Sequence, residues 1–254
     1  MKDKILQKNK MNLKYYLKIL YKFFFFQTYL FWMIKSSRLI TKIYFLIYRN
    51  KGSKSKISKS TELLIDGPMR SANHFALFYI KKFNNISISH HFHSPGSIRL
   101  AYEKKIPTLL LIRNPIDQIA STFIYLENVP LKRVIKSYKI FYEKCLIAKD
   151  WYIVADFQDV INNPEKMVIE INLKYNLNLK YAHLDEKLNK SILNDIQINN
   201  SNLESMKFKL DERTGIPNLK RNVNKDKIKQ ILKKNFYNEL HTCNKIYQSI
   251  INDK

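Results

Sequence analysis

The sequence has little glycine, little cysteine and few acidic residues for its length. Glycine occurs four times and cysteine twice in 254 residues. Cys145 and Cys243 are far apart and lack the spacing of a metal or redox motif. That pattern excludes a disulfide scaffold and predicts reduced, structural thiols in a cytoplasmic protein. The chain is long enough to bury one sizeable core.

The sequence also lacks an apolar run long enough to cross a membrane. The longest charge-free run near the N-terminus, Phe23–Ile34, has twelve residues, whereas a spanning helix needs about 18–20. No small-residue cleavage site follows it, which argues against a removed signal peptide.

Basic charge is concentrated where the sequence is most aromatic. Residues 1–60 contain fifteen Lys and Arg against one acid, so +14 of the net +24 lies there and +10 lies in residues 61–254. Two interpretations fit. Residues 12–48 form a basic, aromatic helix on an anionic membrane surface, which places the protein in the cytoplasm at the membrane periphery, or they form a helical hairpin packed on the core. The alternating Lys and Ser of Lys51–Ser60 predict a flexible linker.

Short apolar runs alternate with helical stretches over residues 61–254. This alternation predicts an α/β domain with a central, mainly parallel sheet, preceded by an N-terminal helical extension over residues 1–60.

The first informative segment is Leu63–Phe75, in which an apolar run leads through Gly67-Pro68 into a helix. Such a junction directs free backbone N–H groups and the positive end of the helix toward one point. Arg70 and Ser71 add side-chain donors suited to phosphate or sulfate oxygens. It is not a Walker A loop, which would need a second Gly and a Lys. An ordinary strand–turn–helix with a surface Arg is the alternative.

The second segment is Thr108–Ile112, a continuous apolar run followed by Arg113-Asn114-Pro115. The run predicts a strand buried on both faces, and Pro115 predicts the start of a helix. Arg113 stands at the strand end, and Ser121 lies about two helical turns into the helix. The two side chains can meet one anion only if the strand end bends back over the helix. The alternative is an Arg113–Asp117 ion pair at the helix start.

Together, and in this order, these segments resemble the two phosphate-binding segments of sulfotransferases that use 3′-phosphoadenosine-5′-phosphosulfate (PAPS). The resemblance covers about residues 61–240 and implies a P-loop-like three-layer fold. It implies that Arg70 contacts the transferred sulfuryl group and that Arg113 and Ser121 hold the 3′-phosphate. Ala72 stands where the family has Gly, which leaves less room for the backbone to approach the phosphate. The remaining loop positions that the resemblance assigns to PAPS binding are Ser71, Ala72, Asn73, His74 and Phe75.

Three histidines between the two segments, in Ser89–Pro95, suggest a metal site, but no Cys partner or HExxH helix accompanies them. A solvated turn is the alternative. The resemblance implies that His93, followed by Ser94-Pro95, is the general base, with His91 in reserve. It also implies that Arg213, in Arg213–Pro217, contacts the 3′-phosphate.

The sequence therefore predicts a PAPS-dependent sulfotransferase that needs no metal and acts on a hydroxyl or amine of a saccharide, lipid or small molecule. Two other classes stay open. A P-loop-like kinase would need a Mg²⁺-binding Ser/Thr after a loop Lys. A non-enzymatic nucleic-acid-binding protein is permitted by charge, but no nucleic-acid motif is present, so no nucleic-acid partner is expected.

Overall fold

Four short strands form a parallel sheet at the centre of the protein. The structure is a computed structural model and describes residues 28–47, 56–126, 129–203 and 219–252. The strands are β1 (Leu63–Asp66), β2 (Ile88–His90), β3 (Thr108–Ile112) and β4 (Ile153–Asp156). Their order across the sheet is β2-β1-β3-β4, and every pairing is parallel. The predicted α/β class and parallel sheet are confirmed.

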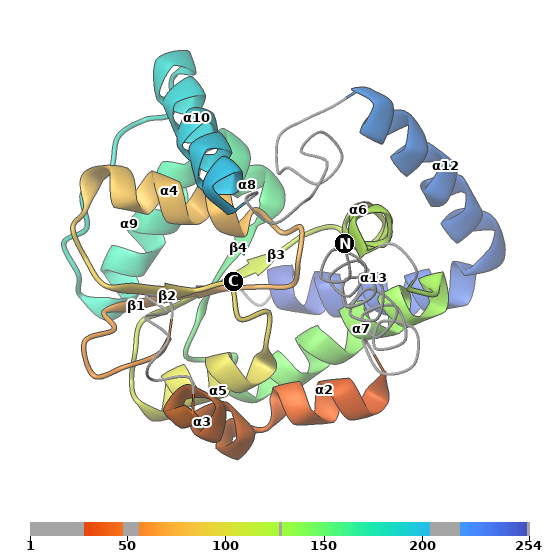
Figure 1. Cartoon of the computed structure of the whole chain (residues 1–254), viewed down its shortest axis with the longest axis horizontal. Coiled ribbons are helices and arrows are strands. Elements are labelled where there is room, and N and C mark those ends of the chain that lie inside the picture. The colour runs from red at the N-terminus through yellow and green to blue at the C-terminus, as the bar shows by residue number, and fades with distance from the viewer. Residues whose placement is uncertain (1–27, 48–55, 127–128, 204–218, 253–254) are drawn as a thin grey trace, which may run out of the picture.

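Alternate residues of β1 and β3 face two different sets of helices, because successive side chains of a strand point to opposite faces. Leu63, Ile65, Leu109 and Leu111 belong to one apolar cluster. That face is covered by α4 (Asn73–Phe83), α8 (Phe157–Asn162), α9 (Pro164–Tyr175) and α10 (Glu186–Leu203), above the sheet in Figure 1.

The opposite face, with Leu64, Leu110 and Ile112, packs in a second cluster. Its helices are α5 (Pro95–Glu103), α6 (Pro115–Leu126), α7 (Leu131–Cys145) and α13 (Tyr237–Asn252), with the 3₁₀ turn Leu146–Ala148 after α7. Helix α12 (Leu219–Asn235) packs on α6. Both cysteines are buried and free. Helices on both faces of one sheet make a three-layer arrangement.

The N-terminal helices α2 (Tyr29–Ser36) and α3 (Arg38–Ile47) pack on this second face. Phe31, Trp32 and Phe45 are buried in the cluster, and the Trp32 indole Nε1–H donates to Ser137 Oγ of α7 at 2.9 Å. For residues 28–47 the structure therefore agrees with the packed hairpin. Residues 12–27 and 48 lie outside the described residues.

Gly96 allows α5 to approach this hairpin closely. A Cβ at Gly96 would meet Thr41 Oγ1 and would lie 2.8 Å from Lys35 O. No larger residue fits there without a backbone shift, so the start of α5 packs directly on the α2–α3 turn.

Among the described helices, none combines the length and apolarity that spanning a bilayer requires.

We expect the burial of α2 to make a large contribution to stability. Trp32→Ala should lower the free energy of unfolding by about 3–5 kcal/mol, because it empties a core site and removes a buried hydrogen bond. The neighbouring Met33 is 52% exposed, so Met33→Ala should change that free energy by no more than about 0.5 kcal/mol. Urea denaturation of both variants measures the difference. Equal, small effects would mean that α2 does not belong to the core.

Candidate functional site

The loops after β1 and β3 meet at the carboxyl edge of the sheet. In the strand order β2-β1-β3-β4, the chain leaves β1 toward β2 on one side and leaves β3 toward β4 on the other side. In open parallel sheets, ligands bind in the crevice at such a reversal of strand order. Both segments singled out from the sequence end there.

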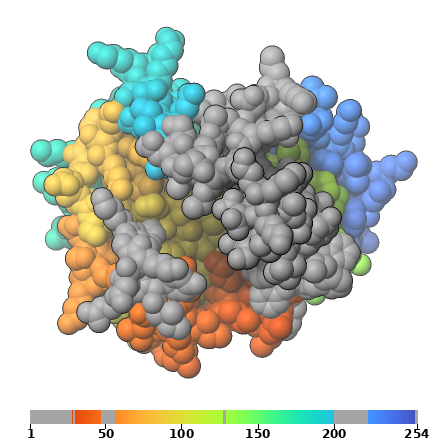
Figure 2. Space-filling model, viewed as in Figure 1, coloured from red at the N-terminus to blue at the C-terminus, as the bar shows by residue number. Residues whose placement is uncertain are grey.

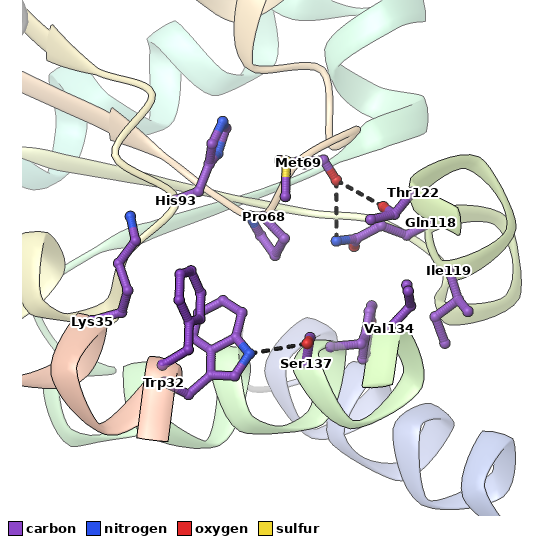
Figure 3. Close-up of a pocket in the computed structure, with 12 residues that line it drawn as sticks. Trp32, Lys35, Pro68, Met69, His93, Gln118, Ile119, Thr122, Val134 and Ser137 are labelled. Carbon is purple, nitrogen blue, oxygen red and sulfur yellow. Dashed lines mark hydrogen bonds between the residues drawn. The ribbon is translucent and has the colours of Figure 1, made fainter. Parts of the chain in front are cut away.

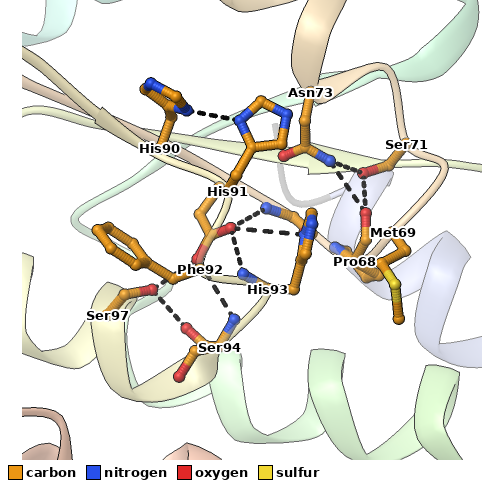
Figure 4. A network of polar contacts seen from close by, with 12 residues as sticks. Pro68, Met69, Ser71, Asn73, His90, His91, Phe92, His93, Ser94 and Ser97 are labelled. Carbon is orange, nitrogen blue, oxygen red and sulfur yellow. Dashed lines mark hydrogen bonds and ion pairs between the residues drawn. The ribbon is translucent and has the colours of Figure 1, made fainter. Parts of the chain in front are cut away.

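The loop after β1 starts at a glycine that leaves no room for a side chain. A Cβ on Gly67 would lie 2.6 Å from Leu111 O and 2.8 Å from Ser71 Oγ. The Ser71 hydroxyl donates to Pro68 O at 2.7 Å, and Asn73 Nδ2 donates to the same carbonyl at 3.0 Å (Figure 4). Ser71 is fully buried. Its hydroxyl therefore stabilises the turn from within.

Two residues of this loop adopt the left-handed conformation. Arg70 has φ 72° and Ala72 has φ 68°. Alternation of left-handed with ordinary residues turns successive N–H groups toward one concavity, which is the geometry of an anion-binding nest. Helix α4 begins at Asn73, so its first N–H groups, including that of His74, have no partner within the helix. Ala72 thus takes the conformation that glycine adopts without cost.

The second segment contacts this loop through Arg70. The Arg113 guanidinium donates to Arg70 O at 2.9 Å and stacks on the Phe157 ring, 3.7 Å from its centroid. Arg70 Nε in turn donates to Ser121 Oγ at 3.1 Å. The structure therefore brings Arg70, Arg113 and Ser121 together, with Arg70 between the other two.

Asp117, which the sequence offered as an ion-pair partner for Arg113, contacts α12. Its carboxylate pairs with Lys225 and Lys229 of that helix. Burial raises the pKa of Asp117, but the hydrogen bonds from the two lysines outweigh burial and bring that pKa below its ordinary value. Asp117 is therefore a charged anchor between α6 and α12.

The loop after β2 is held to the loop after β1 by the buried carboxylate of Asp66. This carboxylate accepts from Gly67 N at 3.0 Å, His93 N at 2.9 Å, Ser94 N at 3.3 Å and Ser97 Oγ at 2.6 Å. Figure 4 shows the His93 and Ser94 side of this network. The backbone of His93 is in the left-handed region, with φ 48°.

The His93 ring forms a hydrogen bond with the loop after β1. Its Nδ1 lies 2.7 Å from Gly67 O. A carbonyl only accepts, so Nδ1–H donates, and a neutral ring then carries its lone pair on Nε2. Burial lowers the pKa of His93, and the Lys35 cation lowers it further, while Asp66 and the Gly67 carbonyl oppose the shift. The side chain is 25% exposed.

His74, His90 and His91 form a chain of ring contacts that the sequence did not predict. His90 Nδ1 lies 2.6 Å from His91 Nδ1, and His91 Nε2 lies 3.2 Å from His74 Nδ1 in α4. Burial, followed by the charge of neighbouring side chains, lowers the pKa of His74 and of His90 to about 4. Within the described ranges, no three His, Cys, Asp or Glu side chains gather as a metal site would require.

Lys35, from α2, is a second feature that the sequence did not predict. Its Nζ donates to Phe92 O at 2.5 Å, and Ser94 Oγ donates to Lys35 O at 2.5 Å. Burial lowers the pKa of Lys35, against the attraction of Asp66. Helix α2 therefore helps to position the loop that carries His93.

Lys35 and His93 also line a cavity of about 170 Å³. Most of its wall is apolar or aromatic and includes Phe31, Trp32, Pro68 and Met69. Figure 3 shows the His93 ring at its edge, turned away from Trp32. A cavity of this size and lining can hold a small apolar group.

The structure does not show Phe75 and Arg213, two residues that the resemblance assigns to PAPS binding, in this group of contacts. Phe75 is 7% exposed and packs in the apolar cluster on the α4 face, so its side chain supports the helix. Arg213 lies outside the described residues.

Comparisons with models of known protein families and with curated proteins found no match to this chain.

The lowered histidine pKa values predict a particular pH dependence of stability. A folded-state pKa of about 4 for His74 and His90, against about 6.5 in the unfolded chain, means that protons bind preferentially to the unfolded state. This part of the stability is complete above about pH 6.5 and is lost as pH falls toward about 4. His74→Gln should therefore flatten the pH dependence of the unfolding free energy in that window.

Chemical denaturation from pH 7.5 to 4.5 measures this slope. His241→Gln provides the control, because His241 is exposed on α13, and it should leave the slope unchanged. Identical slopes for wild type and His74→Gln would contradict the assignment.

Proposed function

We propose that the protein is a PAPS-dependent sulfotransferase. The observation that carries the proposal is the convergence of Arg70, Arg113 and Ser121 on the nest-like loop after β1. This convergence gives one site two guanidinium groups, a hydroxyl and the start of a helix, all donors suited to a bis-phosphorylated nucleotide. The loop then acts as a P-loop-like cradle for the 5′-phosphosulfate.

The proposed reaction is an in-line displacement at sulfur. An acceptor hydroxyl or amine of a saccharide, lipid or small molecule attacks the sulfur, the bond from sulfur to the bridging oxygen of the 5′-phosphate breaks, and 3′-phosphoadenosine-5′-phosphate (PAP) leaves. His93 Nε2 takes the acceptor proton, because the Nδ1–H···Gly67 O hydrogen bond leaves the lone pair of a neutral ring on Nε2. Arg70 stabilises the charge that develops on the bridging oxygen.

The loop geometry favours this function over that of a kinase. In P-loop kinases a loop Ser or Thr hydroxyl binds Mg²⁺. Here the Ser71 hydroxyl is fully buried and donates to Pro68 O, so it points into the turn. The loop cation is an Arg, which provides a forked donor in place of the ammonium of the kinase Lys.

The first test of this function is nucleotide preference. PAP should bind at least about tenfold more tightly than AMP, because one charge-assisted contact to the 3′-phosphate contributes about 1.5–3 kcal/mol. Arg113→Ala should remove most of that preference. Isothermal titration calorimetry without metal measures both affinities, and Arg38→Ala is the control, because the Arg38 guanidinium pairs with Glu103. Equal affinity of wild type for PAP and AMP, or tighter binding of ATP–Mg²⁺, would reject the proposal.

His93→Ala, in the same series, separates chemistry from binding. It should keep PAP affinity near that of wild type while release of PAP from PAPS, assayed with a panel of alcohols, phenols and amines, falls on the order of 10²–10⁴-fold. If His91→Ala, and not His93→Ala, lowers the release of PAP by this factor, the general base is His91.

A second proposal concerns where the protein acts: we infer that the outer side of α2 and α3 rests on an anionic membrane surface. This side exposes large apolar residues even though the inner side is packed in the core. Leu39 is 65% exposed and Leu46 67% exposed. The two helices form a continuous strip at the lower edge of the molecule (Figure 2). The strip belongs to the most basic part of the sequence, residues 1–60.

Vesicle binding tests this proposal. The full chain should float with phosphatidylserine-containing liposomes at low salt and detach as salt rises, since each basic residue near the surface contributes about 1 kcal/mol. Leu39→Ser with Leu46→Ser should weaken the binding without unfolding the protein, because both side chains are exposed. Leu173→Ser, at an exposed position of α9 on the opposite layer, should not. Absence of binding by the full chain at low salt would reject the membrane role.

A further inference from the structure

A cluster of cations lies beside the proposed 3′-phosphate site, and two of its members come from α12. Lys225 Nζ lies 2.9 Å from Asp117 Oδ1, and Lys229 Nζ lies 2.7 Å from the same oxygen. Asp117 is in the first turn of α6, four residues after Arg113. Figure 1 shows α12 beside α6 at one end of the molecule, and the two helices pack together.

Two ammonium groups share one carboxylate oxygen in this cluster. Lys225 and Lys229 therefore bring more positive charge to Asp117 than its carboxylate neutralises. Lys225 is 18% exposed and Lys229 27% exposed, so water screens these charges incompletely. Cations held together in this way are stabilised when an anion binds among them.

The two lysines differ in their surroundings. Burial lowers the pKa of Lys225, the ion pair with Asp117 opposes this, and the nearby charge of Arg113 lowers it again. Lys229 has a second acidic neighbour, since its Nζ lies 3.9 Å from Asp226 Oδ1. The charge of Arg113 therefore acts on Lys225, and Lys229 is the lysine with two carboxylates beside it.

We propose that Lys225 is a further specificity-determining residue, which moves from Asp117 to the 3′-phosphate of PAPS when the nucleotide binds. This inference rests on the proposed function. A phosphate monoester carries a charge of about −1.5 to −2 at pH 7, more than the Asp117 carboxylate offers, so the lysine gains by the exchange. A lysine ammonium suits this movement because it is a point charge on a flexible stem. Asp117 remains paired with Lys229, which keeps α12 attached to α6.

The experiment compares Lys225→Met with Lys229→Met. Both substitutions keep an unbranched stem and remove one ion pair to the same Asp117 oxygen, so a role limited to docking α12 predicts equal effects. The proposal predicts unequal ones. By calorimetry, Lys225→Met should weaken PAP binding by about 10- to 100-fold and change AMP binding less than about twofold. Lys229→Met should weaken PAP binding by less than about threefold.

Thermal unfolding of the free proteins provides the structural readout, and the melting temperatures of the two variants should be alike. Similar losses of PAP affinity in both variants, or an equal loss of AMP and PAP affinity in Lys225→Met, would overturn the inference. If wild type prefers PAP to AMP and Lys225→Met keeps that preference, only the role of Lys225 fails. If wild type shows no preference, the proposed function fails and the inference fails with it.

Discussion

The buried carboxylate of Asp66 is the interaction on which the rest of the site depends. A charge inside a protein is tolerated only when hydrogen bonds replace its hydration. Asp66 obtains them from the backbone of Gly67, His93 and Ser94 and from the Ser97 hydroxyl. These donors come from the ends of two neighbouring strands and the start of α5. One carboxylate therefore fixes the spacing between the loop after β1 and the histidine loop.

This spacing decides what the two loops can do together. With the loops held by Asp66, Gly67 O reaches His93 Nδ1 and commits that nitrogen as a donor. The same loop continues into the left-handed residues Arg70 and Ala72, a backbone alternation typical of anion-binding nests. In the proposed function, the base lies on one side and the anion-binding donors on the other, which are the parts that group transfer from a phosphorylated donor requires.

Local features of the site could be predicted from the sequence, and its tertiary contacts could not. The sequence predicts a strand at Thr108–Ile112 and a helix from Pro115, and the structure has both, because a continuous apolar run and a proline at a helix start are local signals. The contact of Ser121 with Arg70 joins residues 51 positions apart. The Lys35–Phe92 and His74–His91 contacts join residues 57 and 17 positions apart. No periodicity encodes such pairs. The resemblance placed Arg70 and Ser121 at one ligand, whereas no motif indicated the other two contacts, which arise only when the layers pack.

The N-terminal hairpin is packed on the core by one side only. An amphipathic pair of helices can bury one side and expose another, and α2 and α3 bury Trp32 and Phe45 while exposing Leu39 and Leu46. The inner side also reaches the histidine loop, since Lys35 donates to Phe92 O and its carbonyl accepts from Ser94. Helix α2 therefore connects the outer side of the hairpin to the loop that carries His93. Because Lys35 is fixed at both its ammonium and its carbonyl, a shift of α2 on the core must move the histidine loop or break these bonds.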